Sequence, residues 1–100
     1  MLYRTVLNVN EREISLNEYA RKYLTNVVIC AVSMLKGGQN VVTLHYVINS
    51  GESNLIINDQ KIEMIPFLTN ALKGIVSGIT AALKGVEEID TLTLDIYKLE

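Results

Sequence analysis

The feature that most constrains the fold is a near repetition of the chain at a spacing of 48 residues. The segment LKGGQNVVTL at 35–44 returns as LKGVEEIDTL at 83–92, and residues 7–48 align with 55–96 without a gap. A second register, offset by 44, matches YLTN at 23–26 to FLTN at 67–70, and four residues turn a helix only ~40° past a full turn. We interpret the chain as a tandem duplication within a single domain, residues 1–100, with repeats of about 1–49 and 50–100.

Composition limits what such a domain can do. With 100 residues the chain can close one core, and 49% of them are apolar while 20% are charged. The surplus of apolar surface predicts association into a homo-oligomer. The longest apolar run, VVICAV at 27–32, is too short to span a membrane. The lone cysteine and the absence of a signal-peptide pattern suit a cytoplasmic protein.

Each repeat begins with a strand. Alternation over 3–9 places Tyr3, Thr5, Leu7 and Val9 on one side, and the corresponding NLIIN at 54–58 turns its leucine and second isoleucine inward. Tight turns are expected at Asn10 and Asn58, because asparagine side chains bond the local backbone. After these turns, short extra strands are expected at 14–16 and 62–64.

A helix follows in each repeat. Ser15 and Glu18 have capping-box spacing, Pro66 suits a first turn, and the Lys-Gly pairs ending in Gly37 and Gly85 predict helix stops. The apolar half of the first helix would hold Tyr19, Ala20, Tyr23, Leu24, Val27, Val28, Cys30, Ala31, Met34 and Leu35. Thr25 falls on the polar half, as do Ile29 and Val32 without an obvious reason. The β-branched run 27–32 could form a strand instead, but its counterpart contains Gly78, which favours a helix.

The last segment of each repeat alternates cleanly. It places Leu44, Tyr46, Ile48, Leu92, Leu94 and Ile96 inward. Two βαβ units joined by the turn at 49–53 spell βαββαβ. We therefore predict an α+β fold of the ferredoxin-like sandwich type, an antiparallel sheet with both helices on one face, since handedness restricts each crossover.

No motif in the sequence specifies a reaction. Cys30 is expected to be a buried structural thiol, and His45 an ordinary histidine on the outer sheet face, since no second ligand or nucleophile lies near it in sequence. The acidic group Glu87, Glu88 and Asp90 lacks the ligand spacing of a cation loop. The sequence thus predicts no enzyme, no catalytic, metal or cofactor-binding residues, and no cofactor.

Charge is divided unevenly between the repeats. Residues 1–50 carry five basic and three acidic residues, whereas residues 51–100 carry four basic and eight acidic ones. The acidic half would repel phosphate, so nucleic acid is not an expected partner, even though the outer sheet face could carry Arg4, His45 and Tyr97. In a symmetric dimer the two unlike halves could face each other.

The second helix carries the strongest signal outside the core. Its apolar arc spans more than a sheet covers, and Gly74, Gly78 and Ala82 recur every four residues beside Ile75 and Ile79. Either the first helix or a second chain could fill this groove. The sequence therefore predicts a small interaction or assembly module, a homodimer or a complex with another protein. The alternative is a small-molecule-binding protein with a pocket between helices and sheet, present in one repeat only.

Overall fold

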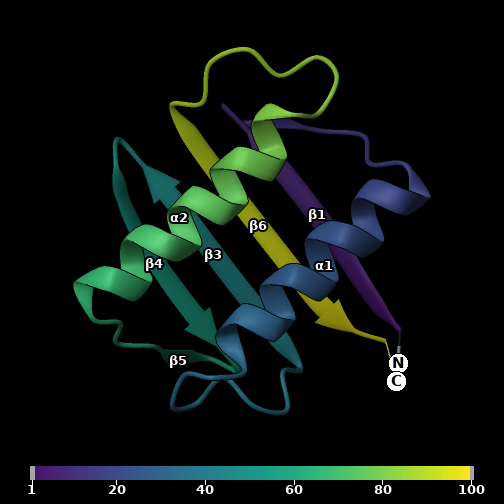
Figure 1. Ribbon diagram of the computed structural model, residues 1–100. Helices are drawn as coiled ribbons and strands as arrows, with labels where there is room; N and C mark the ends of the chain where they lie inside the picture. Colours follow the sequence, from purple (N-terminus) through teal and green to yellow (C-terminus); the bar gives the residue numbers. More distant parts are fainter. Residues whose placement is uncertain (1, 100) are drawn as a thin grey trace.

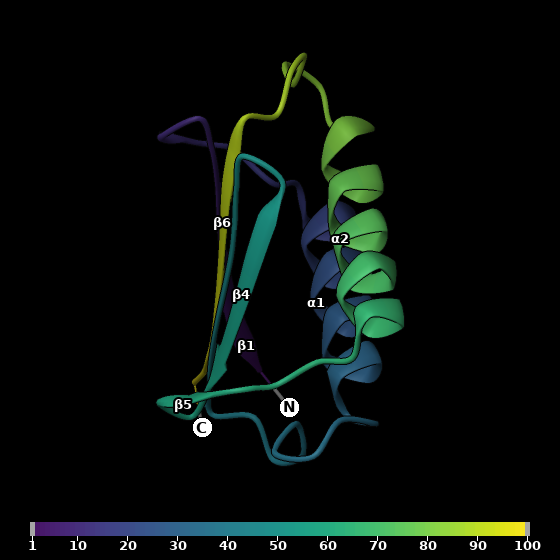
Figure 2. The same cartoon turned by 90° about the vertical axis from the view of Figure 1, so that its left-hand side faces the viewer.

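A computed structural model describes residues 2–99. Two helices cover one face of a single antiparallel sheet, and the opposite face of the sheet is open (Figures 1 and 2). The elements are, in order, β1 (Tyr3–Val9), β2 (Arg12–Glu13), α1 (Glu18–Val32), β3 (Thr43–Asn49), β4 (Glu52–Ile57), β5 (Gln60–Lys61), α2 (Pro66–Ala81) and β6 (Thr91–Lys98). The α+β class, the antiparallel sheet and the helix across 27–32 are confirmed.

The strand order of the sheet is β2-β1-β6-β3-β4-β5. Strands β6 and β3 are central, and each crossover therefore spans one intervening strand: β6 lies between β1 and β3, and β3 lies between β4 and β6. A ferredoxin-like sheet places the first and third long strands at its centre instead. The element order βαββαβ agrees with the expectation, but the ferredoxin-like arrangement is not confirmed.

The hand of the crossovers also differs from the expectation. In Figure 1 the helices lie toward the viewer, β1 runs upward, and the chain returns from α1 as β3 on the left. This makes the crossover left-handed, and the β4–α2–β6 crossover has the same hand, whereas crossovers between parallel strands are nearly always right-handed. The short strand β2 pairs with the edge of β1 on which a right-handed crossover would place β3, and β5 likewise pairs with the corresponding edge of β4. In this fold both edges are therefore occupied.

The two halves of the chain repeat their elements in the same order. The hairpin turns at Asn10 and Asn58 both have positive φ, 50° and 51°, and so do the residues that follow them. Two-residue hairpins of this kind favour asparagine at the first position. The extra strands do form, but at Arg12–Glu13 and Gln60–Lys61, two residues before the expected positions, because each turn takes only two residues.

The core lies between the sheet and the helices. Its largest fully buried side chain is Tyr46, and the central strands contribute all six inward residues expected of them. The remaining buried apolar residues are Leu7, Val9, Ile14, Leu24, Val28, Val32, Leu35, Val41, Leu55, Ile57, Ile62, Leu72 and Val76. The period-two pattern therefore identified the inner sheet face correctly.

The predicted inner face of α1 is right for Leu24, Val28 and Leu35, which are buried, but wrong for other residues. Thr25 is buried, as is Val32, whereas Tyr19 is 80% exposed and Cys30 lies in solvent. The helix can bury Thr25 because its hydroxyl donates to the Arg21 carbonyl and is hydrogen-bonded to the Thr5 hydroxyl from β1. With its polar group satisfied, threonine packs like a small apolar residue, and the helix is rotated toward it.

The sequence also predicted longer helices than the structure has. The N-cap of α1 is Asn17, whose side chain accepts from the Ala20 amide, so the expected Ser15–Glu18 capping box is not formed. Pro66 does begin α2. Both helices end before the Lys-Gly pairs, at Val32 and Ala81. The glycines Gly37 and Gly85 adopt the expected positive φ one turn further on.

Candidate functional site

The outer surface of the helical layer is apolar. On α2, Phe67 is 73% exposed, and Ile75 and the glycines Gly74 and Gly78 are also open to solvent. A Cβ added at either glycine would meet no atom within 4 Å, so α1 does not fill this stripe. The only charged residue of α2 is Lys73, and its ammonium group donates to the Gly51 carbonyl.

A groove runs between the two helices. It has a volume of about 200 Å³. Its walls are Ala31, Val32, Met34, Leu35, Met64, Phe67, Leu68, Ala71, Leu72 and Ile75. Met34 on the α1 side is 79% exposed. The groove therefore lies between the exposed apolar residues of α2 and the exposed Met34, which follows α1.

The residues that the sequence predicted at an interface differ in their exposure to solvent. Gly74, Gly78 and Ala82 are exposed, and Ile75 lies at the edge of the groove. Ile79 is half-buried and packs against the core. Sequence reasoning missed the α1 contribution to this face, because it assigned Tyr19, Tyr23 and Met34 to the core. Their spacings of four and eleven residues, about one and three helical turns, were the available signal, and such spacings are equally typical of a core stripe.

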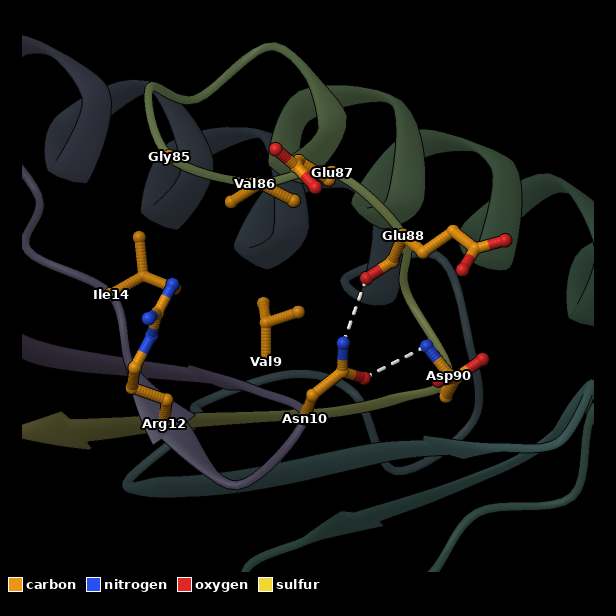
Figure 3. Close-up of a pocket in the computed structure, with 9 residues that line it drawn as sticks. All are labelled: Val9, Asn10, Arg12, Ile14, Gly85, Val86, Glu87, Glu88 and Asp90. Carbon is orange, nitrogen blue, oxygen red and sulfur yellow. Dashed lines mark hydrogen bonds between the residues drawn. The ribbon is translucent and has the colours of Figure 1, made fainter.

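A second, polar cavity lies at the end of the sandwich where the loop after α2 passes the β1–β2 turn (Figure 3). Its volume is about 530 Å³. The lining residues are Val9, Asn10, Arg12, Ile14, Gly85, Val86, Glu87, Glu88 and Asp90. Asn10 fixes the loop on one side: its Oδ1 accepts from the amides of Asp90 and Thr91, and its Nδ2 donates to the Glu88 carbonyl.

The charged side chains around this cavity are not paired with one another. Within residues 2–99 the ion pairs are Lys22–Glu18 and His45–Asp95, so Arg12 makes none. Glu87 makes none either. Figure 3 shows the Arg12 guanidinium beside Ile14 on one side of Val9, and Glu87 on another side, near Val86. The cavity thus has an apolar floor with unlike charges at separate places on its wall.

The open sheet face holds one titratable pair. The Nδ1 atom of His45 on β3 lies in hydrogen-bonding contact with Oδ1 of Asp95 on β6, directly across the strands. The Asp95 carboxylate can only accept, so it binds the Nδ1 side of the imidazole and orients the ring. Among the described residues, no serine or cysteine hydroxyl or thiol is hydrogen-bonded to this pair, and no group of three or more His, Cys, Asp or Glu could hold a metal ion. His45 lies on the outer face as expected; its partner Asp95, 50 positions away, was not anticipated.

Together these features define a two-layer α+β protein with an exposed apolar helical face and a charged cavity at one end. No family model, no curated protein and no solved structure matches the chain. Between residues 2 and 99, neither helix has the length and apolar character that crossing a membrane requires.

Proposed function

We propose that the protein is a small non-enzymatic assembly module that self-associates through its helical face. The observation that carries the proposal is the uncharged, open surface of α2 around Gly78, continuous with the groove lined by Met34 and Phe67. Monomers rarely leave a contiguous apolar surface of this kind uncovered. Its removal from water is the driving force for association.

A second copy of the chain suits this face better than a charged partner does. The α2 part of the face offers no free charge to match, because Lys73 is already bonded to Gly51. Two copies related by a twofold axis can cover each other's grooves with the same exposed side chains. The broad side of the molecule has extents of 34 and 31 Å, which is wide enough for the ~800 Å² that each partner of a stable interface buries.

We also propose that the chain arose by tandem duplication and that the protein is cytoplasmic. The equivalent turns at Asn10 and Asn58, 48 residues apart, support a tandem duplication. Homodimerisation would use the helical layer and leave the open sheet face in solvent. The cytoplasm remains the proposed location, and membrane and nucleic acid are not proposed as partners.

The oligomeric state of designed variants tests the proposal. The wild-type chain should elute in size-exclusion chromatography with light scattering at twice its 11.2 kDa mass. Gly78→Glu places a charge on the helical face, where burial without a partner costs several kcal/mol, so this variant should be monomeric. Asn54→Glu places the same charge on the exposed outer face of β4 and should remain dimeric.

Two results would contradict the proposal. One is a monomeric wild-type chain at about millimolar concentration, where even a weak dimer of ~10 μM affinity is populated. The other is an unchanged dimer in Gly78→Glu whose circular dichroism shows a folded chain, because the interface must then lie elsewhere.

A second candidate function, small-molecule binding, is favoured by the charged cavity at residues 85–90. The cavity lies at one end of the sandwich and is lined by residues that differ between the repeats. It is independent of the helical face.

A further inference from the structure

We propose that the cavity between the β1–β2 turn and the loop 85–90 binds a small zwitterion, with Arg12 holding its anionic group and Glu87 its ammonium group. The inference begins from the difference between the two ends of the sandwich. The halves have the same elements in the same order and matching turns, yet only the residues at one end carry these charges.

The equivalent positions show where the repeats diverge. Shifted by 48, Val9, Ile14 and Gly85 correspond to Ile57, Ile62 and Gly37, which are the same kinds of residue. The charged and bulky residues have no such match. Arg12, Val86, Glu87, Glu88 and Asp90 correspond to Gln60, Gly38, Gln39, Asn40 and Val42. Both ends thus have the same apolar and glycine positions, but only the end lined by Arg12 and Glu87 has the charged residues.

The exchange of Gly38 for Val86 accounts for the opening. Gly38 is buried, and a Cβ added to it would lie 1.8 Å from the Val32 carbonyl oxygen. A valine therefore cannot approach its helix end as closely, and the loop that contains Val86 must stand further away. The neighbouring glycines show the result. A Cβ added to Gly37 would lie 3.0 Å from Cδ1 of Ile62, whereas a Cβ added to Gly85 would meet no atom within 4 Å.

The opposite end is also closed by side-chain hydrogen bonds. Gln39, the equivalent of Glu87, donates from Nε2 to the carbonyls of Ser33 and Leu35 and so ties its loop to the end of α1. A carboxylate cannot donate to these carbonyls. Glu87 consequently remains free at the cavity wall, where it can accept hydrogen bonds from a ligand.

The chemistry of the wall defines the ligand class. A guanidinium pairs best with a carboxylate or a similar planar anion, and a carboxylate pairs with an ammonium group. Between them lie Val9, Ile14 and Val86, which suit a short apolar body. The volume of about 530 Å³ lies within the range of small-molecule sites. An anion alone would face the uncompensated charge of Glu87, and a cation alone would face that of Arg12.

Three probes of equal length separate these cases. We would titrate 6-aminohexanoate, hexanoate and hexylamine, each to about 10 mM, into the ¹⁵N-labelled chain and follow the amide shifts. The zwitterion should shift amides of residues 9–14 and 85–90 in a saturable manner. Each single-charged probe should bind at least about tenfold more weakly, since one charge-assisted hydrogen bond contributes ~1.5–3 kcal/mol.

Substitutions taken from the other repeat test the two charges, and a third substitution serves as the control. Arg12→Gln and Glu87→Gln install the residues found at the equivalent positions, Gln60 and Gln39, and each should weaken 6-aminohexanoate binding about tenfold. Lys61→Gln removes a charge next to the equivalent turn and should leave binding unchanged. If one cavity variant does not fold, the other still tests the site.

The proposal is overturned by any of three results. These are no saturable shifts in residues 9–14 and 85–90 with 6-aminohexanoate, equal binding of all three probes, or wild-type affinity in folded Arg12→Gln and Glu87→Gln. None of these outcomes bears on the oligomeric state, which is measured separately.

Discussion

At the residue scale, equivalent positions of the two halves differ in the hydrogen bonding of a buried hydroxyl group. Thr5 on β1 is hydrogen-bonded to Thr25 on α1. The equivalent of Thr5 is Ser53, but the equivalent of Thr25 is Lys73, whose ammonium group is directed to the Gly51 carbonyl. The Ser53 hydroxyl thus has no threonine opposite it. Within residues 2–99, the buried hydroxyls of Ser53 and Tyr46 both lack a partner of hydrogen-bonding geometry.

Burial raises the pKa of Tyr46 above its usual value of 10.0, and the nearby Ser53 hydroxyl opposes this effect. The folded state therefore retains the proton longer than the unfolded chain. Its full stability is present below about pH 10 and is lost as the pH rises through the folded pKa, because the unfolded state then gains by ionising.

Tyr46→Phe should remove this alkaline loss. It should also leave stability near pH 7 equal to wild type or up to about 1 kcal/mol higher, since a buried hydroxyl without a partner is replaced by an apolar group of the same shape. Urea denaturation at pH 7 and above pH 10 measures both effects. A loss of more than about 1 kcal/mol at pH 7 would show that the hydroxyl is well bonded, contrary to the structure.

At the scale of elements, glycines in the two helical segments have opposite roles. Gly78 lies inside α2 with open space beside it, and Gly38 lies buried against the end of α1. The sequence left open whether the first helix fills the stripe around Gly78, and the structure answers that it does not. The stripe is therefore available to a partner.

Gly78→Ala should raise the free energy of unfolding by about 1 kcal/mol, because alanine is the better helix former and meets no neighbour. Gly38→Ala should lower it by ~3 kcal/mol, because the new methyl group would overlap the Val32 carbonyl oxygen. Denaturation at low protein concentration, where association does not contribute, compares the two. Equal effects of the two substitutions would contradict the packing described for α1 and α2.

At the scale of the whole molecule, two asparagines join the halves. Asn10, in the first half, binds the loop before β6, and Asn58, in the second half, binds the loop before β3 through the Val42 and Thr43 amides and the Asn40 carbonyl. The contacts are exchanged between the halves, so neither repeat completes its own loop. We infer that one repeat alone would leave these loops unanchored.

Asn10→Gly and Asn58→Gly keep the positive φ that each turn needs while removing the side-chain bonds. Each should cost about 2 kcal/mol, for three exposed hydrogen bonds. The sites lie near opposite ends of β6, roughly 20 Å apart, so the double variant should equal the sum of the single ones within ~0.5 kcal/mol. Equilibrium unfolding of the four chains measures this. Strong non-additivity would mean that the two ends are energetically coupled.

The sequence by itself determined the local structure of this protein. Period-two alternation gave the inner faces of β3 and β6, and asparagine chemistry gave both hairpin turns, since these depend on neighbouring residues alone. The spacing of 48 residues also predicted two halves with the same elements. The candidate cavity could have been suspected from positions where the repeats diverge, such as Val86 against Gly38.

Only the tertiary structure decided the strand order, the hand of the crossovers and the rotation of α1. The short strands β2 and β5 occupy the outer edges of β1 and β4, and a two-residue pairing has almost no sequence signal. The rotation of α1 follows from a hydrogen bond between Thr5 and Thr25, which are 20 residues apart. Hydropathy assigns threonine to the surface, and only a partner from another element satisfies its hydroxyl and permits burial. The same rotation exposes Tyr19 and Met34, and thereby creates the apolar face on which assembly is proposed.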